Sequence, residues 1–219
     1  MTEKQSQKKR DPARTREAIL EAAREVLAQD GKEGLSVAQV AQKAGVNRGT
    51  AYQHFQTREQ LIEETASWVS DKLYRAVFGD PEVAQDEPVE VIDVEAINAR
   101  LASFAMENPA LGRVWLFQVL STGRRASDPF WRQYESNFAR FAETEMAQPG
   151  LDVEVLSVLF IAGSFVWPVW ARSRARNAKQ RLQLAERFSR ETLRLALHGT
   201  LRPEKYEELD ARVTRRERP

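Results

Sequence analysis

The side chains with the most informative chemistry lie in the stretch NRGTAYQHF, residues 47–55. Arg48 and Gln53 can each form paired hydrogen bonds with a base edge in the DNA major groove. Hydroxyl and imidazole groups can bind phosphate oxygens and so position a protein on the DNA backbone. Three neighbouring residues carry such groups: Thr50, Tyr52 and His54. The pattern favours a DNA contact, in which the small Gly49 allows the backbone to approach the phosphates closely.

Capping signals predict that two short helices position these side chains. Ser36 and Gln39 have the spacing of a capping box, in which each side chain satisfies an unpaired N–H at a helix start. Gly45 stands where the chain must turn, and Asn47 is a good N-cap for a second helix through about Phe55. Two short helices joined by a glycine-containing turn form the helix-turn-helix unit, whose second helix lies in the major groove.

The apolar residues of the two helices fit this arrangement. One face of the first helix and the turn carry Val37, Val40, Ala41, Ala44 and Val46. In the second helix, Ala51 and Phe55 would face the protein, and the polar residues would face DNA. A helical hairpin that does not bind DNA remains the alternative.

Longer helices are predicted on both sides. Residues 13–29 carry an apolar stripe between Pro12, which suits a helix entrance, and Asp30-Gly31, which suits its end. Leu35 is expected to pack beneath this helix. Thr57 and Gln60 repeat the capping-box spacing and open a helix to about Phe78. One side of that helix holds Leu61, Ile62, Thr65, Ala66, Val69, Leu73 and Val77.

Charge is unevenly distributed, although the formal net charge of the 219 residues is only +1. Residues 1–16 hold six Lys or Arg against two acidic residues. A basic arm beside a helix-turn-helix can add phosphate contacts or enter a minor groove; a solvated tag is the alternative. The further predicted DNA contacts are Lys9, Arg10, Arg14 and Ser36.

Residues 14–61 resemble the DNA-binding domain of the tetracycline-repressor (TetR) family of bacterial transcription regulators. The resemblance rests on ILEAAREVLAQDG, LSVAQVAQKAGVNRGTAYQHF and REQLI. Gly45, Val46, Gly49, Tyr52 and Phe55 match the family's G-V-S-x-G-x-x-Y-x-x-F pattern. Asn47 replaces the usual Ser, Ala51 replaces a larger aliphatic residue, and Arg58 replaces the usual Lys.

The resemblance implies an all-α homodimer with an N-terminal three-helix DNA-binding domain and a C-terminal helical ligand-binding and dimerisation domain. It implies that a small molecule bound in the C-terminal domain releases a palindromic DNA operator. We expect a basic arm (1–12), a DNA-binding domain (13–57), a ligand-binding and dimerisation domain (58–199) and a charged tail (200–219).

Aromatic residues are concentrated in the predicted C-terminal domain. Helices are expected over 94–106, 109–122 and from 130, with Asn108-Pro109 and Asp128-Pro129 as cap and first residue. Aromatic stripes at helical spacing are commonly core, but the family places its pocket among these helices. The candidate residues for a hydrophobic or amphipathic ligand are Phe104, Trp115, Phe117, Phe130, Trp131, Tyr134, Phe138, Phe165 and Trp167.

Residues 155–171 contain no charge. This run is shorter than the ~20 residues that a membrane crossing needs, so we expect a helix buried on all sides rather than a membrane span. Pro168 should kink or end it. Residues 181–198 predict a further amphipathic helix that Gly199 closes. Helices over about 153–171 and 181–198 suit the four-helix dimer interface that the resemblance implies.

Two charged segments have alternative interpretations. Residues 79–97 contain seven acidic residues and two prolines, which favours a solvated linker over a cation site. The basic stretch 172–181 is expected to be a solvated turn and helix start, with a pocket mouth for an anionic ligand as the alternative.

The sequence contains few of the residues and motifs that enzymes use in catalysis. The chain has no cysteine and two histidines, and it lacks a phosphate-binding glycine loop and a metal-ligand motif. We therefore expect no catalytic residues, metal or cofactor, and a cytoplasmic location. The alternative is a helical enzyme or adaptor without DNA binding. The effector, the operator, the regulated genes and the sign of regulation do not follow from the sequence.

Overall fold

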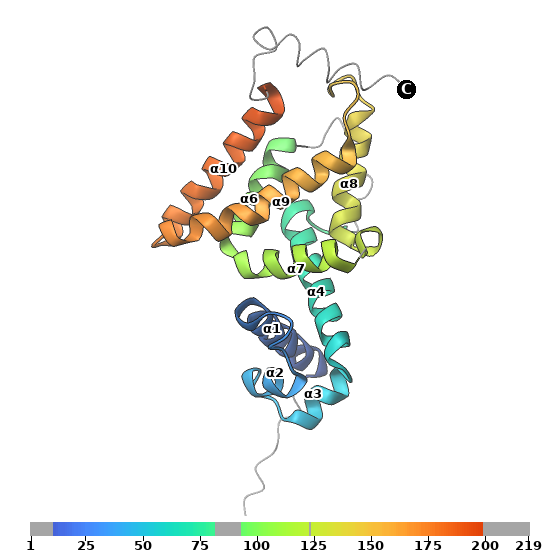
Figure 1. The fold of residues 1–219 in the computed structure, drawn as a ribbon, viewed down its shortest axis with the longest axis vertical. Helices are drawn as coiled ribbons and strands as arrows, with labels where there is room; N and C mark the ends of the chain where they lie inside the picture. Colours follow the sequence, from blue (N-terminus) through green and yellow to red (C-terminus); the bar gives the residue numbers. More distant parts are fainter. Residues whose placement is uncertain (1–10, 82–92, 123, 199–219) are drawn as a thin grey trace, which may run out of the picture. The chain divides into compact units, whose positions relative to one another are not determined.

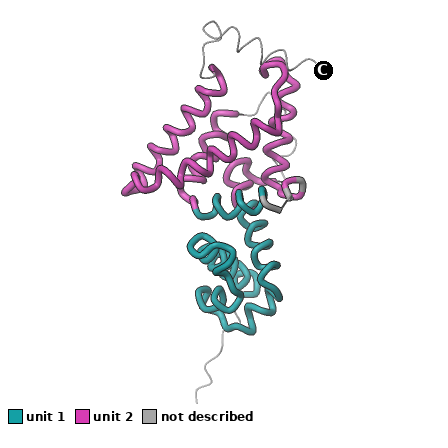
Figure 2. Tube along the Cα trace, viewed as in Figure 1, with its two compact units in different colours: residues 1–70, 110–121 teal, residues 71–109, 122–219 magenta. Residues whose placement is uncertain are grey.

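The computed structural model describes residues 11–81, 93–122 and 124–198, and this part of the chain is built of helices without a strand (Figure 1). The predicted all-α fold is confirmed. Contacts divide the chain into unit 1, residues 1–70 and 110–121, and unit 2, residues 71–109 and 122–219 (Figure 2). The predicted DNA-binding domain, 13–57, lies within unit 1. Unit 1 also takes residues from two later helices.

Unit 1 contains the three predicted N-terminal helices. These are α1 (Pro12–Asp30), α2 (Val37–Lys43) and α3 (Arg48–His54). The unit also includes the first part of α4 (Arg58–Phe78) and most of α7 (Pro109–Thr122). Asp11 caps α1 by accepting a hydrogen bond from the Ala13 N–H at 3.0 Å.

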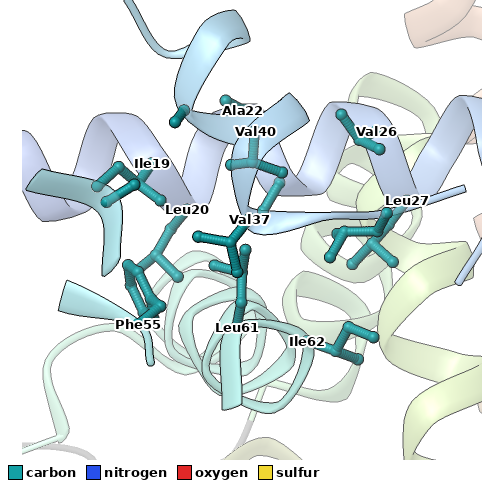
Figure 3. Close-up of a cluster of buried hydrophobic side chains, with 14 residues drawn as sticks. Ile19, Leu20, Ala22, Val26, Leu27, Val37, Val40, Phe55, Leu61 and Ile62 are labelled. Carbon is teal, nitrogen blue, oxygen red and sulfur yellow. The ribbon is translucent and has the colours of Figure 1, made fainter. Parts of the chain in front are cut away.

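One apolar core holds unit 1 together (Figure 3). It joins side chains from α1, α2, α3 and α4, and Leu35 from the loop after α1 lies within it, as predicted. Its large members are Ile19, Leu20, Val26, Leu27, Val37, Val40, Phe55, Leu61 and Ile62. The helical faces deduced from the sequence are therefore the faces that the fold buries.

Unit 2 is built from four longer helices. These are α6 (Val94–Glu107), α8 (Pro129–Ala142), α9 (Val153–Ala171) and α10 (Ala178–His198). Helix α9 packs against α6, α8 and α10. The Asn98 amide on α6 donates to the Ser189 carbonyl and hydroxyl oxygens on α10, both at 2.9 Å, and so fixes that pair of helices. Short 3-10 turns, η2 (Arg124–Ser127) and η3 (Arg172–Arg174), precede α8 and follow α9.

The two predicted cap-and-proline pairs behave differently. Asp128 caps α8 as predicted, accepting from the Trp131 N–H at 2.9 Å, with Pro129 as the first helical residue. Asn108 instead ends the preceding helix, because its side-chain amide donates to the Phe104 carbonyl at 3.0 Å. Pro109 still begins α7.

In the single chain, residues 155–171 are not buried on all sides, and the dimer interface expected to complete their burial stays a prediction. Helix α9 exposes a row of apolar side chains: Val155, Leu159, Val166, Val169 and Trp170. Pro168 does not end the helix, which continues to Ala171.

Helix α9 and η3 together form a stretch of 22 residues, Val153–Arg174. By length and composition alone, this stretch could span a membrane. The expectation that this segment is too short for a membrane crossing does not hold once the whole helical stretch is counted. Its packing against three helices of unit 2 gives it a role in a folded core.

Several predictions concern residues outside the described part of the chain. They are the basic arm 1–10, with Lys9 and Arg10, most of the acidic run, Gly199 and the charged tail.

Replacing Phe55 by Ala should destabilise unit 1 strongly. Its ring is fully buried at the end of α3, and truncation of a buried Phe costs about 3–5 kcal/mol through lost apolar burial and the cavity left behind. Chemical denaturation followed by circular dichroism measures this change. Tyr52→Ala on the same helix is the control and should change the free energy of unfolding far less, because Tyr52 is 40% exposed. Equal losses would contradict the assignment of the two faces.

Candidate functional site

Helix α3 is held by the capping groups that the sequence indicates. The Asn47 side chain accepts from the Thr50 N–H at 2.7 Å, and Ser36 accepts from the Gln39 N–H at 3.2 Å at the start of α2. Gly45, in the turn between them, has φ +65°, a conformation that costs a non-glycine residue steric strain. These features fix the angle at which α3 leaves the turn.

The two faces of α3 separate as predicted. Ala51 and Phe55 are fully buried in the core of unit 1. The opposite face carries the candidate DNA contacts, of which some are exposed and some partly buried: Arg48, Gly49, Thr50, Tyr52, Gln53 and His54. We call this set the α3 face. It is the arrangement that a recognition helix requires, with polar groups outside and an apolar anchor behind.

Two of these residues support one another. The Arg48 guanidinium lies 5.7 Å from the centre of the Tyr52 ring, within the range of a cation–π contact. Because they stand four residues apart on one helix, this contact limits the positions that the Arg48 side chain explores. Ser36 and Arg14 are also exposed, at the first turn of α2 and of α1 respectively.

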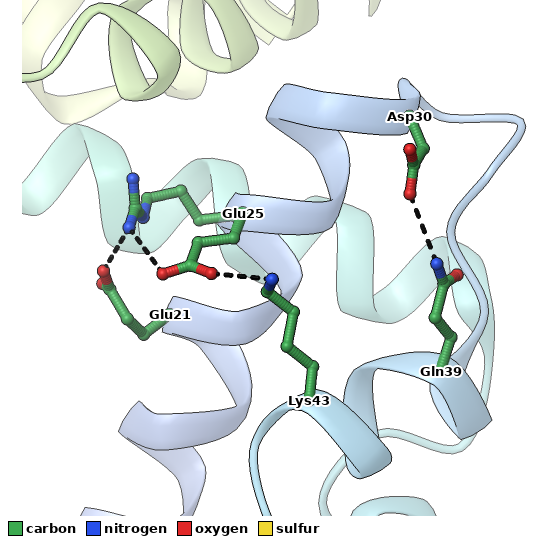
Figure 4. Close-up of polar contacts among 6 residues, drawn as sticks. Glu21, Glu25, Asp30, Gln39 and Lys43 are labelled. Atoms are coloured by element: carbon green, nitrogen blue, oxygen red, sulfur yellow. Dashed lines mark hydrogen bonds and ion pairs between the residues drawn. The ribbon is translucent and has the colours of Figure 1, made fainter.

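In each predicted capping box, only one of the two hydrogen bonds forms. Gln39 and Gln60 both donate their backbone N–H to the predicted cap, but their side chains turn elsewhere. The Gln39 side-chain amide donates to Asp30 at the end of α1 at 3.3 Å (Figure 4). The Gln60 side-chain oxygen accepts from the Gln56 N–H at 2.9 Å. The first contact ties α2 to α1, which sequence spacing cannot reveal.

An ion pair adds a second tie between these helices. Lys43 at the end of α2 lies 2.9 Å from Glu25 of α1 (Figure 4). The hydrogen bond from Lys43 and its positive charge lower the pKa of Glu25. Both groups are partly exposed, so the pair orients α2 more than it stabilises the fold.

Arg58 is a structural anchor that the sequence did not reveal. Its guanidinium, at the first residue of α4, donates to the Leu35 carbonyl at 3.1 Å and to the Lys32 carbonyl. These acceptors lie in the loop between α1 and α2, 23 and 26 residues away in sequence. Arginine can donate to both carbonyls with one planar fork, whereas a lysine would offer only a point charge.

Ring contacts within unit 2 join several of the aromatic residues proposed to line a ligand site. A ladder of ring contacts runs along α8 from Phe130 to Tyr134, Phe138 and Phe141, and Phe138 also meets Phe160 of α9. Trp167 contacts Trp170 and stacks on Phe188 of α10. The ladder confirms the predicted stripe on α8.

The remaining candidates are divided between the two units. Phe130, Trp131 and Phe165 are buried core residues, and Phe104 is partly buried. Trp115 and Phe117 belong to unit 1, where Trp115 is buried and Phe117 is 64% exposed. Whether any of these residues contacts a ligand stays a prediction.

Unit 2 contains a cavity of about 600 Å³ between the second half of α4 and the first half of α8. Its lining is Asp71, Tyr74, Arg75, Pro81, Pro129, Arg132, Gln133 and Ser136. None of the predicted aromatic candidates lines it directly. Within the described residues, no three His, Asp or Glu side chains gather closely enough to hold a metal ion.

Comparison with known proteins supports the assignment of unit 1. Residues 19–65 match the family model for bacterial regulatory proteins of the tetR family. The nucleoid occlusion factor SlmA of Sodalis glossinidius is 28% identical over 115 residues, 52% of this chain and 54% of SlmA. The match therefore spans about half the length of the curated relative.

Solved structures show that the fold extends beyond this region. A Clostridium perfringens protein described as a fatty acid metabolism regulator has a TM-score of 0.65 at 21% identity, covering 84% of this chain and 99% of that one. AibR, crystallised with isovaleryl coenzyme A and operator DNA, has a TM-score of 0.62 at 20% identity, covering 80% and 96%. Residues 19–65 thus match the tetR family of bacterial regulatory proteins, and the chain shares the fold of these solved structures.

Proposed function

We propose that this protein is a DNA-binding transcription regulator, a homodimer that binds a palindromic operator and releases it when a small molecule binds unit 2. The observation that carries the proposal is the α3 face, whose polar side chains point outward while Ala51 and Phe55 anchor the helix from behind. This geometry lies in the region that matches the tetR family. Repression is the family's usual action, and the cytoplasm of a bacterium is where such a protein meets DNA.

Roles on the α3 face divide by chemistry. Arg48 and Gln53 are the candidates for base edges, since both are exposed and can form two hydrogen bonds with a purine. We assign the phosphate contacts to Thr50, Tyr52 and His54. Arg14 and Ser36 at helix N-termini, with Lys9 and Arg10 of the arm, extend the phosphate contacts.

Dimerisation is assigned to α9 and α10. The exposed apolar row on α9 is matched on α10 by exposed Leu182, Leu195 and Leu197. A surface of this composition on two neighbouring helices suits the apolar core of a permanent interface. A two-fold dimer would place two copies of α3 for successive major grooves.

The effector is a small molecule that unit 2 accommodates. AibR, which shares the fold, binds both isovaleryl coenzyme A and operator DNA, and this supports a ligand-responsive mechanism here. To act, the molecule must bind the DNA-incompetent conformation more tightly than the competent one. The comparisons do not favour the alternative, a helical enzyme or adaptor without DNA binding.

Arg48→Ala should relax sequence preference. Loss of a paired contact to one base costs about 1–3 kcal/mol on the operator and little on random DNA. Tyr52→Phe, which removes a phosphate-binding hydroxyl, should weaken operator and random DNA alike. Binding isotherms over a range of salt concentrations measure both, and wild-type affinity should fall steeply with salt. An equal loss on both DNAs for Arg48→Ala would refute its assigned role.

Gly49→Ala should lower DNA affinity while leaving the protein folded. The residue is exposed, its φ is not positive, and an added Cβ would meet only the Asn47 side-chain oxygen at 3.5 Å. Alanine in a helix is favoured over glycine by up to ~1 kcal/mol. The measurements are thermal unfolding and DNA binding. Gly45→Ala is the contrast, because its positive φ predicts destabilisation. Full DNA affinity in Gly49→Ala would contradict a close backbone approach.

Leu159→Asp should convert the dimer to monomers. Leu159 is 61% exposed on α9, and a charge there would be buried by a second copy. Sedimentation equilibrium measures the change. Val94→Asp, at an exposed residue that begins α6, is the matched control and should leave the dimer intact. A dimer that survives Leu159→Asp would place the interface elsewhere.

A further inference from the structure

The cavity between α4 and α8, here called the α4–α8 groove, is defined by the eight residues that line it in unit 2. Its volume of about 600 Å³ lies within the range of small-molecule sites in proteins. It differs from the predicted aromatic pocket, because most of its lining side chains are polar or charged. The lining chemistry therefore indicates what class of molecule fits.

The charge of the lining favours an anion. Two guanidinium groups, Arg75 on α4 and Arg132 on α8, face the groove together with one carboxyl, Asp71. Among the described residues, no ion pair engages the Arg132 side chain. Guanidinium groups bind carboxylate and phosphate oxygens through paired hydrogen bonds, so two of them lining one groove favour an oxyanion there.

One carboxyl in the lining, Asp71, opposes this charge. Burial and the nearby Asp128 raise its pKa, and burial is the larger cause, while Arg75 acts in the other direction. The lining thus carries two guanidinium groups against one carboxyl.

An apolar layer lies beneath the charged rim. Tyr74 is buried, and its hydroxyl donates to the Gln133 side-chain oxygen at 3.3 Å, which joins α4 to α8. The Gln133 amide in turn donates to Asn137 at 2.9 Å, so its orientation is fixed. The Tyr74 ring meets Phe78 at 5.3 Å, and Phe78 meets Phe130 at 5.4 Å. Pro81 and Pro129 add apolar edges.

We propose that the α4–α8 groove binds a small amphipathic anion, with its carboxylate or phosphate held by Arg75 and Arg132 and its apolar part against Tyr74 and the two prolines. The aromatic ladder of α8 then serves as the support behind the groove rather than as its surface. The effector role of this ligand rests on the proposed function, whereas its binding does not.

The same helix connects this groove to unit 1. Asp71, Tyr74 and Arg75 lie on α4, the continuous helix whose first residue, Arg58, binds the loop between α1 and α2. A ligand that draws Arg75 toward Arg132 therefore acts on the helix that anchors the helix-turn-helix. Reciprocal linkage then requires that DNA weaken ligand binding by the factor by which ligand weakens DNA binding.

Four probes with one octyl chain and different head groups test the proposal on the full-length protein. They are octanoate, octyl phosphate, octanol and octylamine, with inorganic phosphate as a head group alone, and isothermal titration measures binding. Octanoate or octyl phosphate should bind at least about tenfold more tightly than octanol or octylamine, and their ranking separates a carboxylate from a phosphate site. Equal binding of octanol, or no binding of either octyl anion at about 1 mM, would overturn the proposal.

Variants locate the site. Arg75→Gln and Arg132→Gln remove exposed charges, so the protein should stay folded by circular dichroism, and each should weaken the octyl anion about tenfold. Arg100→Gln, an exposed position on α6 outside the groove, is the matched control and should bind normally. Unchanged binding of the anion in the Arg75→Gln/Arg132→Gln double variant would place the site elsewhere.

DNA binding by the same proteins separates this inference from the proposed function. If wild-type protein binds octanoate but no duplex DNA at low salt, the proposed regulator function is refuted and the proposed anion site is not. If the protein binds DNA normally but does not distinguish the four octyl probes, the proposed anion site is refuted and the proposed regulator function is not.

Discussion

The burial of Ala51 and Phe55 is the interaction on which the candidate DNA surface depends. Helix α3 has seven residues, which is two turns, and so short a helix is not stable in water by itself. Its conformation is set from outside, by the Asn47 cap, the left-handed Gly45 and the apolar core of unit 1. The polar side chains that would meet DNA lie outside the apolar core of unit 1, which leaves their chemistry free for recognition.

Helix α4 has a second structural role, because it supplies residues to both units. Its first residue, Arg58, holds the loop between α1 and α2 through two backbone carbonyls, and its residues 71–75 line the α4–α8 groove. Backbone carbonyls cannot be removed by substitution, so this anchor depends only on the arginine. One continuous helix thus supports the DNA-binding region and lines part of a cavity.

Local signals explain what could be predicted from the sequence. The caps at Ser36, Asn47 and Asp128 and the turn at Gly45 act within four residues, and apolar spacing identified the faces of α1 to α4. Contacts between distant segments could not be predicted: the Gln39 bond to Asp30, the carbonyls bound by Arg58 and the polar groove. They depend on which helices meet, and spacing along the chain does not encode that.

The exposed apolar row of α9 links the stability of the protein to its abundance. Apolar side chains such as Leu159 and Val166 gain free energy only when another surface removes them from water. If a second copy provides that surface, mass action makes unit 2 more resistant to unfolding at high protein concentration than at low. A cell that makes little of the protein would then hold it in a weaker fold, and the level of expression would itself tune how much folded regulator is present.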